Sequence, residues 1–196
     1  MKYLDPDGRV INIEGDDPFK TDVQKSIDYL KQSKTGKMVI EELEKPGNVF
    51  TIKQCDWLNN LPGAEGGDSY DDENKTIYWN AHWTIEASNR KYNSPAICLM
   101  HEFVHAFTDR TKNGKAMYNQ FLAICGDKLK DPKYYKPREE FATVMEQKIA
   151  AELGEPSGRR WYLDLHLTVD NYERPRYYYT TQIMVPSPLF NSSKER

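Results

Sequence analysis

The sequence lacks the features that mark several large classes of protein. No apolar run approaches the roughly 20 residues that span a bilayer, and the first ten residues, MKYLDPDGRV, have no apolar signal-peptide core. Three cysteines, Cys55, Cys98 and Cys125, contain no Cys-x-x-Cys pair, which argues against a disulfide framework or a thiolate zinc site. The net charge is −3 with both signs mixed along the chain. We therefore expect a soluble protein that binds neither nucleic acid nor membrane.

Size and composition predict a single domain. The chain has 196 residues, of which 38% are hydrophobic, enough to fill one core. Helical and strand-like patterns occur together, so we expect an α+β fold in which a small twisted sheet packs on helices. Residues 1–16 are interpreted as a hairpin arm or lead-in and residues 170–196 as an irregular tail. We expect the protein to be a monomer.

The most informative stretch is an apolar helix that contains His101-Glu102-Phe103-Val104-His105. Ser94 suits the N-cap of this helix and Pro95 its first turn, and the helix is expected to continue to Arg110. Residues four apart lie on one face of a helix, so His101 and His105 are placed to bind one metal ion. Glu102 is then placed to take a proton from a water molecule that attacks a carbonyl, as in HExxH metallopeptidases.

Burial of this helix strengthens the metal hypothesis. The helix is apolar nearly all round, which is typical of a core helix. Two histidines and a glutamate in such a helix are costly unless they have partners, and a bound cation would provide one. The alternative is a coincidence of composition, with one histidine hydrogen-bonded in the core and the other at the surface.

The other elements follow from periodicity and turn signals. Apolar residues at helical spacing predict helices over Pro18–Gln32 and Ser33–Glu44, and a further helix around Met117–Cys125. A short strand is expected at Val49–Ile52 and a loop at Leu58–Glu73.

Alternation of apolar and polar residues from Thr76 to Ile85 predicts one half-buried strand just before the motif helix. We expect this strand to flank the cleft and its free edge to pair with an extended substrate. His82, on the polar face, is expected to line the cleft.

A third metal ligand is sought in the helix predicted to start at Pro137. Glu139 and Glu140 stand in its first turn, where carboxylates are also favourable for electrostatic reasons alone. On a helical wheel Glu140 falls nearer the face that carries Phe141, Val144 and Ala151, so Glu140 is preferred and Glu139 is the second choice. His166, on the polar side of a later alternating run, is the main competitor. Two histidines and one glutamate leave the fourth position of zinc to water, as a catalytic site requires.

These motifs resemble a known family. HEFVHAF, followed by EEFATVMEQKIAAELGEP and then Arg-Arg-Trp-Tyr, resembles the NleD-type effector metalloproteases that bacteria inject into host cells. The resemblance covers roughly residues 25–165 and departs between Arg110 and Arg138 and after Leu167. It implies a zincin fold, Zn2+ as cofactor with His101, His105 and Glu140 as ligands, Glu102 as base, and a protein substrate.

Two downstream Arg-x-x-Tyr pairs are candidates for stabilising an oxyanion. Arg159 with Tyr162 is preferred to Arg174 with Tyr177. Similar pairs serve this role in clostridial neurotoxin light chains, which are also zincins with a glutamate ligand. Because the chain contains 13 tyrosines, a chance match is a real alternative.

The predicted function is that of a zinc endopeptidase, a secreted effector or toxin that cleaves a protein of a target cell. Two alternatives remain open: a zinc hydrolase of a non-protein amide, and a non-catalytic binding module with the zincin shape. The absence of a classical signal also fits a cytoplasmic enzyme.

Overall fold

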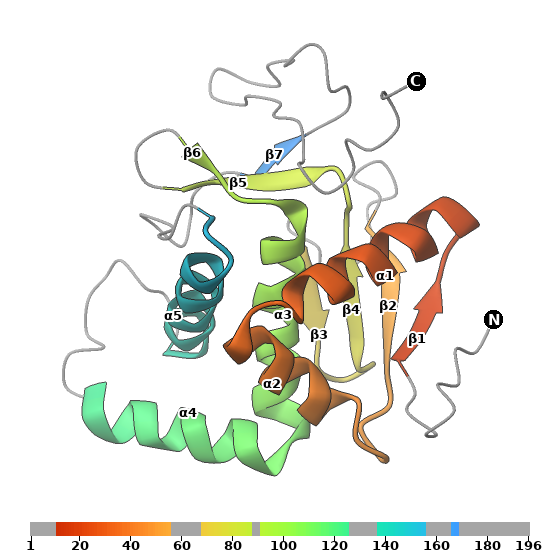
Figure 1. Cartoon of the computed structure of the whole chain (residues 1–196). Helices are drawn as coiled ribbons and strands as arrows, with labels where there is room; N and C mark the ends of the chain where they lie inside the picture. The colour runs from red at the N-terminus through yellow and green to blue at the C-terminus, as the bar shows by residue number, and fades with distance from the viewer. Residues whose placement is uncertain (1–10, 56–67, 88–90, 126–136, 156–165, 169–196) are drawn as a thin grey trace.

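The computed structural model describes residues 11–55, 68–87, 91–125, 137–155 and 166–168 (Figure 1). The helices in this part of the chain are α1 (Asp17–Leu30), α2 (Lys34–Leu43), α3 (Pro95–Arg110), α4 (Lys112–Cys125) and α5 (Pro137–Glu152). The strands are β1 (Ile11–Glu14), β2 (Phe50–Gln54), β3 (Ser69–Asp71), β4 (Thr76–Trp79), β5 (Trp83–Ala87), β6 (Lys91–Tyr92) and β7 (His166–Thr168). The predicted α+β class is confirmed. No helix in the described residues is both long and apolar enough to cross a membrane.

The strands form two small sheets. The larger has the order β1-β2-β4-β3, with β1, β2 and β4 parallel and β3 antiparallel at one edge. The smaller has the order β6-β5-β7 and is antiparallel. Figure 1 shows α1 alongside the larger sheet and α2 next to α3, with α3 running past β3 and β4 and with α5 on the other side of α3.

The core lies between the larger sheet and α3. Its four fully buried aromatic side chains in the described residues are Phe50 of β2, Trp79 of β4, and Phe103 and Phe107 of α3. Leu30 of α1 and Ile40 and Leu43 of α2 are also fully buried. The Trp79 indole nitrogen donates a hydrogen bond of 2.9 Å to the carbonyl of Pro95, the first residue of α3. This bond fixes the start of the motif helix to the sheet, since a buried indole N–H needs an acceptor.

The strand predicted from Thr76 to Ile85 is two strands in different sheets. Asn80 ends β4, and its side chain explains the break: its Oδ1 accepts the backbone N–H of His82, and its Nδ2 donates to the carbonyl of Cys55. An asparagine that bonds the backbone two residues on forms a turn. Alternation continued through this turn, so the pattern alone did not reveal it. The predicted free edge is also wrong, because β4 lies between β2 and β3 and β5 lies between β6 and β7.

Two further expectations need correction. The predicted hairpin arm is instead β1, which pairs in parallel with β2, residue Ile11 opposite Phe50. The predicted loop at Leu58–Glu73 contains β3, in which Tyr70 pairs with Ile77 of β4. The first ten residues and residues 170–196 lie outside the described part of the chain.

The helix starts were predicted more successfully. Helices form at both Pro18–Gln32 and Ser33–Glu44, within a few residues of the expected ends. Ser33 caps α2, since its hydroxyl accepts the N–H of Gly36. Ser94 occupies the N-cap of α3 but makes no such bond. Gly154, with φ of +73°, follows the end of α5, a conformation that glycine adopts without strain.

The end of α5 is attached to the starts of two other helices by carboxylates. Glu152 accepts hydrogen bonds from the Ser33 hydroxyl and from the Thr35 hydroxyl and N–H, with lengths of 2.6, 2.6 and 2.8 Å. Glu155 accepts bonds from the Ser94 N–H and hydroxyl, both 2.6 Å. Free N–H groups at a helix start favour a negative partner. These contacts hold α5 against α2 and α3 and thereby set which of its side chains face the motif helix.

Candidate metal centre

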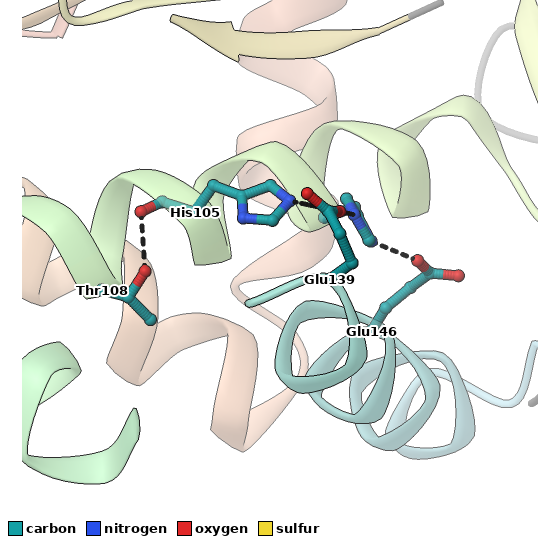
Figure 2. A network of polar contacts seen from close by, with 5 residues as sticks. His105, Thr108, Glu139 and Glu146 are labelled. Atoms are coloured by element: carbon teal, nitrogen blue, oxygen red, sulfur yellow. Dashed lines mark hydrogen bonds and ion pairs between the residues drawn. The ribbon is translucent and has the colours of Figure 1, made fainter. Parts of the chain in front are cut away.

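The two motif histidines lie on the buried α3 helix with their rings together. His101 is 3% exposed and His105 is 8% exposed. Their ring centroids are 4.8 Å apart with an interplanar angle of 76°, and the two Nε2 atoms are 3.1 Å apart. The Thr108 hydroxyl donates to the carbonyl of His105, as Figure 2 shows. One turn of helix therefore brings two imidazole nitrogens to a common point, as the motif predicted.

The start of α5 supplies a carboxylate at this point. Glu139 Oε2 is 3.0 Å from His105 Nε2 and 3.3 Å from His101 Nε2. Figure 2 shows Glu139 reaching from α5 toward the histidine of the facing helix. Atoms bound to one tetrahedral zinc at 2.0–2.2 Å are about 3.3–3.6 Å from one another. The three ligand atoms are therefore close to the spacing that a single zinc ion requires, and two imidazoles with one carboxylate are a suitable donor set.

The sequence preferred Glu140 as the third ligand, whereas the described structure brings Glu139 into the group with His101 and His105. The reason is that the helical wheel was oriented by the wrong residues. Val144 is 46% exposed and Ala151 is also exposed, so two of the three apolar markers do not face the core. Glu140 is half-buried at the next position along the helix. Glu139, the second choice from sequence, is the carboxylate that the geometry favours.

The electrostatics of Glu139 are consistent with an ionised ligand. Burial alone would raise the pKa of its carboxyl group, but the contacts with the imidazoles of His101 and His105 outweigh burial and lower that pKa well below its usual value. The carboxylate is thus ionised at neutral pH. It provides negative charge beside two imidazoles, the condition under which a divalent cation binds.

A second carboxylate of α5, which sequence reasoning missed, contacts the other side of His101. Glu146 Oε2 is 2.8 Å from His101 Nδ1, and Glu146 is 1% exposed. Figure 2 shows Glu139 and Glu146 both reaching from α5. The signal available in the sequence was their spacing: seven residues are two turns of helix, so Glu139 and Glu146 share a face.

The other residues predicted for the site are not part of the group formed by His101, His105 and Glu139. Glu102 is buried on α3, next to His101 in sequence, and its role as base remains a prediction. His82 is exposed in the turn between β4 and β5. The backbone of His166 pairs with Ile85 in the smaller sheet, but its side chain is outside the described part of the structure. The two pairs Arg159 with Tyr162 and Arg174 with Tyr177 also lie outside it.

The fold and the site together define an α+β protein with a candidate metal centre between two helices, a suitable framework for hydrolysis. A comparison with known families agrees with this class. The model of the Peptidase_M91 family, described as "Effector protein", matches residues 7–146. The chain belongs to this peptidase family of effector proteins, and the resemblance to NleD-type effectors is confirmed. No curated protein matches the sequence significantly. The family implies a protein substrate and suggests action in a host cell.

Proposed function

We propose that this protein is a zinc-dependent endopeptidase that acts in a target cell and cleaves a protein there. The observation that carries this proposal is the convergence of His101 Nε2, His105 Nε2 and Glu139 Oε2 within 3.0–3.3 Å of one another. Membership of a peptidase family of effector proteins supports both the reaction and the setting. His101, His105 and Glu139 would hold the ion.

Each residue of the motif then has a defined task. When bound, zinc supplies Lewis acidity to the site. Glu102 takes a proton from the attacking water and afterwards donates it to the leaving amine, the general acid–base role of a carboxylate. Glu102 lies on the same buried helix as the two histidines, in surroundings with little solvent to compete for the proton.

The edge strand β3 is the best candidate for holding an extended substrate. Among the described strands it pairs with β4 alone, so its outer edge carries unpaired backbone groups. It also contacts α3, and the Tyr70 hydroxyl of β3 donates to Asp109 of α3 over 2.7 Å. A peptide that adds a strand at this edge would gain main-chain hydrogen bonds next to the motif helix.

The test is proteolysis of cell-lysate proteins by the wild type and by Glu102→Gln, with new N-termini identified by mass spectrometry and zinc measured in both proteins. We expect new N-termini with the wild type alone and equal zinc in the two proteins. Stoichiometric zinc without cleavage of any protein would contradict the endopeptidase and favour a binding module. Absence of zinc after reconstitution would contradict the metal centre itself.

A further inference from the structure

The two ring nitrogens of His101 face two different carboxylates, one inside the candidate ligand group and one outside it. Nε2 lies in the candidate ligand group, 3.3 Å from Glu139 and 3.1 Å from His105. Nδ1 lies 2.8 Å from Glu146 Oε2, at the short end of the range for N–H···O bonds. Glu146 therefore contacts the site through the ring of His101.

We infer that Glu146 is a positioning residue, which holds the His101 ring with its Nδ1–H directed at the Glu146 carboxylate and its Nε2 lone pair directed at the metal site. An imidazole that donates its N–H to a carboxylate has its tautomer and rotation fixed, and its other nitrogen becomes a better ligand. This inference rests on the proposed function insofar as the ion is zinc.

Both partners of the contact between Glu146 and His101 are buried. Glu146 is 1% exposed and His101 is 3% exposed, so little water is available to replace either partner. An ionised carboxylate at such depth is costly unless hydrogen bonds compensate it. A helix in this position would carry an apolar residue at lower cost. Orientation of the His101 ring gives a reason for a glutamate, rather than an apolar residue, at this buried position.

The backbone also limits how far Glu146 can move. The same helix places Glu139 and Glu146 two turns apart on the face toward α3, and Phe141 and Ile149 of that helix are buried in the core. Glu152 and the nearby Glu155 attach its end to the starts of α2 and α3. One rigid element thus presents both the candidate ligand and the carboxylate that orients the neighbouring ligand.

The experiment uses the full-length protein with Glu146→Gln and Glu146→Ala. Lys148→Gln is the matched control, because it removes a charge from an exposed position of the same helix, outside both the candidate ligand group and the attachment of the helix end. Zinc affinity is measured by competition with a chromophoric chelator, and the tautomer of His101 in metal-free protein is measured from ¹⁵N–¹H long-range correlations. Thermal unfolding of each metal-free protein separates positioning from loss of fold.

We expect wild-type His101 to carry its proton on Nδ1, and Glu146→Ala to lose this preference. Zinc affinity should fall about 10-fold to 100-fold in Glu146→Ala, less in Glu146→Gln, whose carbonyl still accepts, and not in Lys148→Gln. Wild-type affinity in Glu146→Ala, or an unchanged His101 tautomer, would overturn the positioning role while leaving the proposed function intact. If wild type binds no zinc, the proposed function fails, and with it the role of Glu146 toward a metal.

Discussion

The Glu139 carboxylate lies 3.0 Å from His105 Nε2, across the interface between the first turn of α5 and the middle of α3. This contact joins the HExxH motif to a helix that starts 32 residues after His105 (137 − 105). It has consequences for metal binding, stability and catalysis that can each be measured.

The first prediction distinguishes the two adjacent glutamates. Glu139→Ala should lose stoichiometric zinc, because it removes one of the three proposed ligands, whereas Glu140→Ala should retain it. Elemental analysis of purified, dialysed protein measures the difference, with His166→Ala as a further comparison. Zinc that stays in Glu139→Ala but leaves with either of the other two variants would assign the third ligand elsewhere.

A second prediction concerns stability with and without metal. An ion that binds only the folded state stabilises it by about 4 kcal/mol at a free concentration 1,000 times Kd. A chelator should therefore lower the thermal midpoint of the wild type. The midpoint of Glu139→Ala should barely respond to chelator or added zinc. Equal responses of the two proteins would show that the ion binds at another place.

The proposed catalytic base, Glu102, gives a third prediction. Glu102→Gln keeps the size of the side chain but cannot accept the proton of water, so kcat for a cleaved protein should fall by about 10²-fold to 10⁴-fold. KM should change little, since substrate contacts are retained. Progress curves at several substrate concentrations separate the two constants. Loss of zinc from this variant would contradict the separation of ligand and base.

The hydrogen bonds that Glu152 accepts at the start of α2 predict that the stability of the fold depends on pH. Although partial burial raises the pKa of Glu152, hydrogen bonds from Ser33 and Thr35 outweigh it and lower that pKa to about 2 from an ordinary value of 4.5. A carboxyl group whose pKa is lower in the folded state stabilises the fold above its ordinary pKa, and this contribution disappears as pH falls from about 5 to 2.

Urea unfolding of the wild type and Glu152→Gln at pH 7 and near pH 2 tests this dependence. At pH 7 the substitution should cost about 1 kcal/mol, a typical value for a lost helix cap. Near pH 2 the difference should shrink, because about half of the wild-type carboxylate is then protonated in the folded state. A constant difference across this range would mean that the cap does not depend on charge.

The junction between α3 and α4 gives a prediction opposite to the usual rule. Alanine in place of a helical glycine commonly stabilises by up to about 1 kcal/mol. At Gly114, however, a Cβ atom would lie 2.0 Å from the carbonyl oxygen of Phe107. Gly114→Ala should therefore destabilise by about 1–3 kcal/mol in urea unfolding. Lys115→Ala, at an exposed position of the same helix, should change stability by less than about 0.5 kcal/mol.

The sequence alone determined the elements and chemistry that depend on local spacing. His101 and His105 fall together because four residues make about one helical turn. The buried motif helix also follows from a pattern within a few residues. The resemblance to effector metalloproteases rested on the same local motifs and is confirmed by the family.

Tertiary structure decided what depends on the rotation and pairing of whole elements. The rotation of α5 about its axis selects Glu139 over Glu140 and brings Glu146 to His101. Contacts of Glu152 and Glu155 with helices far away in sequence fix this rotation. A wheel drawn from apolar residues could not fix that rotation, since Val144 is exposed. The break at Asn80 was likewise hidden, because alternation persists through a turn when both flanking strands are half-buried. Local spacing therefore specified two candidate ligands, and packing between helices specified the third candidate.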